Sequence, residues 1–146
     1  MGLPDGRFHV TALGAGGAYV FLEDLDRVEF LHALGIAIER FQWRLLVYCL
    51  MGTHYHLLIS AETEKLVSGM QWLNGVYAQG FNKRYERRGH LFGSRFGCRA
   101  IVDERHNDAT VQYILNNPVR AGLCERAEDW PWSYAAAEVG GMAAAA

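Results

Sequence analysis

Two histidines lie one residue apart in an apolar stretch of the sequence, LMGTHYHLLIS, at residues 50–60. The aliphatic composition predicts a strand, in which successive side chains point to opposite faces. His54 and His56 would then project to one face, about 7 Å apart along the strand. Neutral imidazole is the commonest ligand of divalent metals, so the pair can chelate an ion. Two histidines on a partly solvated sheet face are the simpler alternative, because the H-x-H pattern alone is weakly specific.

A second polar pair, Tyr113 and Asn117, is four residues apart in the sequence YILNNP. This spacing puts both side chains on one face of a helix. The proline at 118 disfavours helical conformation at the residue before it, which would free the Asn117 oxygen to turn toward an ion. The Tyr113 phenol would lie one turn earlier. A core tyrosine followed by an asparagine that caps the helix would give the same pattern.

Hydrophobic periodicity predicts the elements that must position these four side chains. Their order is strand, helix, strand, strand, helix, strand, helix. The first six give an α+β, ferredoxin-like βαββαβ fold, an antiparallel sheet with helices on one face, and an additional C-terminal helix carries Tyr113. Asn107 or Asp108 is expected to cap that last helix and Pro118 to end it. The predicted strands are 7–13, 43–51, 54–60 and 91–102, with a short extended piece at 18–22, and the predicted helices are 26–41, 65–88 and 109–117.

The bulk composition indicates an ordinary soluble protein of one domain. The chain has 146 residues, of which 51% are hydrophobic, enough to bury a core. We expect a single domain over 1–146, with a disordered alanine-rich tail from about 135 to 146. No apolar run reaches the roughly 18 residues of a membrane span, and no export signal is visible. These features predict a cytoplasmic protein without a membrane partner.

Three cysteines, Cys49, Cys98 and Cys124, stand at unrelated spacings and form no CxxC pair. This usage favours reduced thiols in the cytoplasm and argues against metal ligation by cysteine.

The net charge of −2 does not by itself suggest a nucleic-acid partner, but the charges are unevenly distributed. The segment 83–99 has six basic side chains and one acidic one, whereas 1–50 has four basic and six acidic. A concentrated basic segment favours an anionic partner that docks on one face. A solvated helix end is the alternative.

Taken together, these pieces resemble the single-tyrosine HUH transposases of bacterial insertion sequences, in particular the REP-associated tyrosine transposases. The resemblance runs from about Arg7 to Tyr134, and the ordered combination carries its specificity. Its segments are YCLMGTHYHLLIS, MQWLNGVYAQGFNKRYERRGHLFGSRF, YILNNPVRAGL and DWPWSY.

This resemblance implies a role for each candidate residue. Tyr113 corresponds to the nucleophile that forms a 5′-phosphotyrosine link with DNA, which lets the strand be cleaved and rejoined. His54, His56 and Asn117 correspond to the ligands of a divalent metal, Mg²⁺ or Mn²⁺. The implied substrate is single-stranded or hairpin DNA, and the family includes dimers, so a homodimer is an expected assembly. The basic residues that would contact phosphates are Lys83, Arg84, Arg87, Arg88, Arg95, Arg99 and Arg120.

Two features depart from the family pattern. Gly52-Thr53 replaces the usual Pro-Asn before the first histidine, and the loop ALGAGGAYVF, residues 12–21, lacks the usual polar residues. We therefore keep three hypotheses. The first is a metal-dependent DNA strand transferase. The second is a hairpin-binding protein, derived from such a transposase, that does not cleave. The third is a metal-dependent hydrolase that uses water as its nucleophile.

Overall fold

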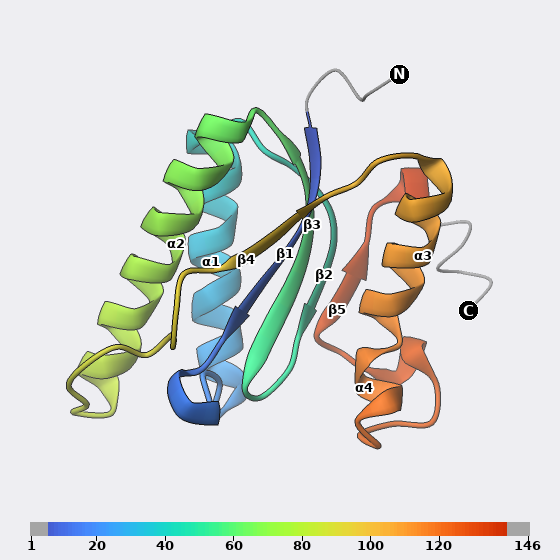
Figure 1. Cartoon of the computed structure of the whole chain (residues 1–146). Helices are drawn as coiled ribbons and strands as arrows, with labels where there is room; N and C mark the ends of the chain where they lie inside the picture. The colour runs from blue at the N-terminus through green and yellow to red at the C-terminus, as the bar shows by residue number, and fades with distance from the viewer. Residues whose placement is uncertain (1–5, 140–146) are drawn as a thin grey trace.

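The structure is a computed structural model that describes residues 6–139 (Figure 1). Its strands are β1 (Gly6–Leu13), β2 (Arg44–Leu50), β3 (His54–Ala61), β4 (Gly97–Ala100) and β5 (Ser133–Ala135). Its helices are α1 (Asp24–Arg40), α2 (Thr63–Arg84), α3 (Glu104–Leu115) and the short α4 (Asn117–Arg120), with 3₁₀ turns at Ala15–Gly17 and Ala127–Asp129.

The five strands form one sheet in the order β4-β1-β3-β2-β5, and all neighbours are antiparallel. Helices α1 and α2 cover one face, and α3 and α4 lie on the other (Figure 1). The first six main elements have the βαββαβ order, so the predicted ferredoxin-like fold is confirmed. Strand β5 extends the sheet beyond β2, beside α3.

The central strand β3 is apolar on both faces, because helices cover it on both sides. Tyr55, Leu57 and Ile59 pack into the core beneath α1 and α2. Leu58 belongs to a second core beneath α3. Since side chains alternate along a strand, His54 and His56 share the α3 face with Leu58.

Several boundaries differ from the predicted ones. Residues 18–22 form no strand, and of the predicted strand 91–102 only Gly97–Ala100 pairs in the sheet. The segment before it is held by loop contacts instead: the Leu91 carbonyl accepts a hydrogen bond from the Ala15 amide, and the Gly93 amide donates to the Leu13 carbonyl.

The end of the chain also differs from the prediction. Pro118 does not end the helical region but stands in the first turn of α4, where a missing amide proton costs nothing. Helix α3 begins earlier than predicted, with Asp103 as its cap. Of the predicted tail, residues 135–139 are described, and Ala136 and Val139 are buried there. Residues 140–146 lie outside the described residues. Within 6–139, no helix has both the length and the apolar character to cross a membrane.

Gly69 on α2 sits where the helix packs tightly against two buried or half-buried rings. An added Cβ would lie inside van der Waals contact with the Trp43 ring and 3.0 Å from Phe41 Cδ2. By contrast, a Cβ at Gly35 on α1 would meet nothing within 4 Å.

Gly69→Ala is therefore expected to destabilise the fold by about 1–3 kcal/mol through overpacking. Gly35→Ala should stabilise it by up to about 1 kcal/mol, because alanine is the better helix former. Urea unfolding followed by circular dichroism measures both values. Equal effects of the two substitutions would contradict the described packing of α2.

Candidate active site

A cavity of about 680 Å³ opens between α3 and the sheet, and it brings the four predicted site residues together in one chain. His54 and His56 reach it from β3, Tyr113 from α3, and Asn117 from the start of α4. The remaining lining residues are His9, Thr11, Leu13, Gly97, Cys98, Arg99, His106, Ala109 and Thr110.

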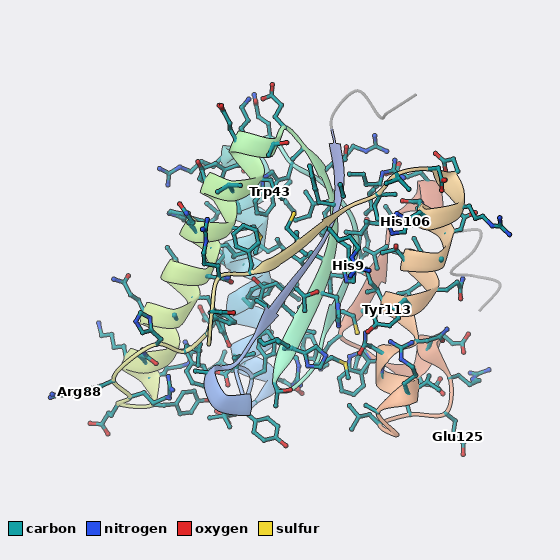
Figure 2. The ribbon with its side chains drawn as sticks, viewed as in Figure 1. His9, Trp43, Arg88, His106, Tyr113 and Glu125 are labelled. Carbon is teal, nitrogen blue, oxygen red and sulfur yellow. The ribbon has the colours of Figure 1, made fainter. Side chains whose placement is uncertain are left out.

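One stripe of α3 forms the outer wall of the cavity. His106, Thr110 and Tyr113 recur at spacings of four and three residues, so they share a helix face, and Asn117 continues the row. Asp103 caps the helix by accepting a hydrogen bond from the His106 amide at 2.8 Å. Figure 2 shows His106 and Tyr113 beside His9, in the space between α3 and the sheet.

The three histidines of the sheet stand close together beneath this wall. The ring centroids of His54 and His56 are 5.1 Å apart, and Tyr113 lies 5.9 Å from His56 by the same measure. His9 Nε2 is 2.9 Å from His56 Nδ1, and Thr53 Oγ1 is 3.1 Å from His54 Nδ1. Both β3 histidines are thus held through Nδ1.

Burial keeps these imidazoles neutral. It lowers the pKa of His56 to about 3, helped by the nearby His9, His54 and Arg120. Burial also lowers the pKa of His54, although a hydrogen bond with Asn117 partly offsets this effect. The pKa of His9 is lowered as well, first by burial and then by the charges of Arg99 and His106. A neutral imidazole retains the lone pair that a metal ion needs.

The donor set fits the divalent ion that the sequence predicts. His54 and His56 offer imidazole nitrogens, and the contact with His54 places the Asn117 amide beside them. Asn117 would coordinate an ion through its side-chain oxygen, because its amide nitrogen is only a donor; that nitrogen is buried without a hydrogen-bond partner among the described groups. Within residues 6–139, no cluster of three or more His, Cys, Asp or Glu side chains is arranged to hold an ion. Among the residues that line this cavity, Asn117 is the one that would complete the ligand set that the resemblance implies.

Arg120 contacts Tyr113 in two ways, through the ring and through the backbone carbonyl. Its guanidinium lies 4.1 Å from the centroid of the Tyr113 ring, and its Nη2 donates a hydrogen bond to the Tyr113 carbonyl at 2.9 Å. The exposed cation therefore lies next to the Tyr113 ring, where it can attract a phosphate.

The predicted basic segment does not form one docking face. Arg84 is engaged with the fully buried Asp26 in an ion pair of 2.8 Å, and Arg87 donates to Asn82. Figure 2 shows Arg88 at the opposite side of the molecule from Tyr113. The remaining members are divided between separate places: Lys83 is exposed at the end of α2, Arg95 lines a second cavity of about 510 Å³, and Arg99 lines the Tyr113 cavity.

The two departures from the family pattern contact each other. The Gly52 carbonyl accepts hydrogen bonds from the amides of Val20 and Phe21 at 2.9 and 3.1 Å, and the Thr53 carbonyl accepts one from the Gly14 amide at 2.8 Å. A Cβ on Gly52 would lie 2.8 Å from the Tyr19 ring. Hydrogen bonds from the uncharged loop thus stabilise the turn before the histidines, and that turn contains no proline.

The sequence reasoning missed His9, Thr11 and His106. A signal existed for the first two, because Arg7, His9 and Thr11 alternate with apolar residues along β1. Their proximity to His56 depends on the register of β1 against β3, in which Thr11 lies opposite His56. His106 stands two helical turns before Tyr113, a spacing that places both on one face.

Comparisons with known proteins identify the family and the fold. The family model described as transposase, IS200 like, matches residues 9–117, from His9 to Asn117. A solved REP-associated tyrosine transposase, bound to a REP hairpin, superposes with a TM-score of 0.71 at 18% identity, over 88% of this chain and 75% of that one.

A second solved structure, a protein of Deinococcus radiodurans R1 described as a transposase, gives a TM-score of 0.55 at 17% identity, over 78% of this chain and 92% of that one. No curated protein matches the chain. Both structural similarities are at the level of the fold, whereas the family match covers most of the sequence. The chain belongs to the IS200-like transposase family.

Proposed function

We propose that this transposase is a metal-dependent DNA strand transferase that cleaves and rejoins single-stranded or hairpin DNA through a covalent 5′-phosphotyrosine intermediate on Tyr113. One observation carries the proposal: Tyr113, His54, His56 and Asn117 line one cavity, although they come from different elements of the chain. The half-exposed phenol is accessible to a strand that enters the cavity from solvent.

The proposed step is a displacement at one DNA phosphate. The Tyr113 oxygen forms a bond to phosphorus, and the bond from phosphorus to the 3′ oxygen breaks. Water at the exposed phenol takes its proton, and the departing 3′ oxygen gains one. The phosphodiester energy is conserved in the phosphotyrosine, so a 3′ hydroxyl can reverse the step and join strands without a nucleotide cofactor.

His54, His56 and Asn117 are the residues that would hold Mg²⁺ or Mn²⁺, and imidazole ligands favour Mn²⁺. The ion supplies Lewis-acid polarisation of a phosphoryl oxygen. Arg120, which contacts the Tyr113 ring, and Arg99, which lines the cavity, provide positive charge that would hold the flanking backbone. The REP hairpin bound to the structural relative supports a hairpin as the first substrate to test.

The test is adduct formation on a labelled DNA hairpin with single-stranded flanks. The full chain is incubated with the hairpin and Mn²⁺, Mg²⁺ or EDTA, and the products are separated on a denaturing gel. A covalent adduct that needs the divalent ion is the expected result. Salt-sensitive hairpin binding without an adduct under any ion would support the non-cleaving alternative, and loss of both would contradict DNA strand transfer.

A further inference from the structure

His9 contacts His56, one of the proposed metal ligands, and none of the roles assigned so far includes it. Its Nε2 lies 2.9 Å from His56 Nδ1, and the two rings stack with centroids 5.1 Å apart and planes 28° apart. Thr11 Oγ1 is a weaker neighbour of the same nitrogen at 3.4 Å. The main polar contact of His56 is therefore with His9.

Backbone pairing fixes this contact. His9 lies opposite Leu58 on β3, two residues beyond His56, so the two histidines are diagonal neighbours on one face of the sheet. Both strands are interior strands of the five-stranded sheet, with β4 on one side of β1 and β2 on the other side of β3.

The hydrogen bond can be made in two ways, and only one leaves His56 able to bind an ion. If His56 donates from Nδ1, its Nε2 has a free lone pair, and His9 accepts at Nε2. If His9 donates instead, a neutral His56 has its proton on Nε2, where it blocks coordination. A metal-bound histidine commonly has its other nitrogen bound to an acceptor, which fixes the tautomer and the ring.

His54 is held in a corresponding way by a different group. Thr53 Oγ1 lies 3.1 Å from His54 Nδ1, a contact in which either group can be the donor. Both β3 histidines therefore have a polar neighbour at Nδ1, which comes from the turn in one case and from β1 in the other.

We propose that His9 is a positioning residue that accepts a hydrogen bond from the Nδ1–H group of His56 and so aims His56 Nε2 at the divalent ion. This inference rests on the metal centre of the proposed function. It assigns to His9 an acceptor role rather than a place among the ligands. That distinction fits the described residues, in which the histidines form no three-member metal cluster.

The test measures Mn²⁺ binding directly, without DNA. The metal-free full chain is titrated with Mn²⁺ and the free ion is followed by electron paramagnetic resonance. His9→Ala removes the acceptor and should weaken Mn²⁺ binding by about 10–100-fold. His9→Gln retains an acceptor near the position of Nε2 and should recover most of the affinity. His32→Ala, at an exposed histidine on α1 across the sheet, is the matched control and should bind as the wild type does.

Other outcomes would overturn the inference in separable ways. Unchanged Mn²⁺ affinity in His9→Ala, with binding lost in His56→Ala, would leave the metal centre intact and remove the role of His9. Equal loss in His9→Ala, His9→Gln and His56→Ala would make His9 a ligand. If the wild type binds no Mn²⁺ yet forms adducts, the metal centre itself fails, and the inference fails with it. Circular dichroism and hairpin binding in EDTA check that each variant is folded.

Discussion

Tyr113→Phe is expected to abolish the covalent protein–DNA adduct while hairpin binding in the same buffer stays close to that of the wild type. The substitution removes one oxygen atom, the proposed nucleophile, and leaves no second group to form the phosphotyrosine. The loss should be on the order of 10³-fold or more, as for other nucleophiles of covalent catalysis.

The structure predicts that this loss is not caused by unfolding. The Tyr113 hydroxyl makes no hydrogen bond with another described group, and half of the side chain is exposed. The stacking of Arg120 on the ring survives in phenylalanine. The thermal midpoint of the variant should therefore match that of the wild type.

Tyr134→Phe is the matched control for this experiment. Tyr134 lies on β5, its side chain is 43% exposed against 50% for Tyr113, and its ring stacks on Tyr48. This variant should form the adduct at the wild-type rate. An adduct that persists in Tyr113→Phe, or one that Tyr134→Phe also loses, would show that the nucleophile has been wrongly assigned.

The sequence was sufficient for the fold because local periodicity and topology agreed. The H-x-H stretch could be placed on β3 because its neighbours are aliphatic, and alternation alone put His54 and His56 on one face. Likewise, the helical spacing of Tyr113 and Asn117 predicted a shared face. The cavity that contains all four depends on how α3 packs against the sheet, which the spacing of these residues does not predict.

Hydrophobic periodicity does not predict contacts that depend on strand register, nor which of two structural roles a residue takes. His9 joins the site because β1 pairs with β3 in one register out of several that would bury the same apolar residues. Pro118 was expected to end a helix, yet it starts α4, since proline suits a first turn as well as a stop.

Charge patterning was the weakest guide. A run of basic residues does not show which of them already form ion pairs within the protein. Arg84, for example, is paired with the buried carboxylate of Asp26. Arg120 stands outside that run in the sequence, yet it contacts Tyr113 directly. Electrostatic footprints therefore have to be read from the folded surface rather than from the composition of a segment.

Asp26→Ala is expected to produce a large loss of stability. Asp26 is fully buried and joins the start of α1 to the end of α2. Its carboxylate accepts hydrogen bonds from the amides of Leu22 and Glu23 at 2.8 and 3.0 Å, from the Tyr85 hydroxyl at 2.8 Å, and from Arg84 Nη2 at 2.8 Å. Removing the carboxylate takes one acceptor from each of these four donors, although the Tyr85 hydroxyl keeps a contact with Glu23 at 3.2 Å.

The cost should be about 3 kcal/mol, at the lower end for one half of a buried ion pair, because Arg84 keeps some access to water. A domain of this size has a free energy of unfolding of about 5–15 kcal/mol, so the variant loses a large part of its stability. Urea unfolding at pH 7 measures the difference. A change below about 1 kcal/mol, which is typical of an exposed pair, would contradict the buried network.

The same carboxylate makes stability depend on acid. Burial alone would raise the pKa of Asp26, but hydrogen bonds from the backbone of Leu22 and Glu23, then from Tyr85 and Arg84, hold it below the usual value of 3.8. A lowered pKa contributes stability that is present above the unfolded value and is lost as the pH falls through the folded one. Asp26→Asn should therefore show a shallower loss of stability below about pH 4 than the wild type does.

Arg84 decides between the structural and the DNA-binding interpretation of this network. In a double-mutant cycle, Asp26→Ala and Arg84→Ala should be coupled by about 0.5–3 kcal/mol, since the two side chains are in direct contact. If the role of Arg84 is structural, Arg84→Ala lowers stability but keeps the salt dependence of hairpin binding, whereas Arg99→Ala, at the cavity, makes that dependence shallower. The opposite pattern would mean that DNA competes with Asp26 for Arg84, so that binding the substrate would loosen the junction between α1 and α2.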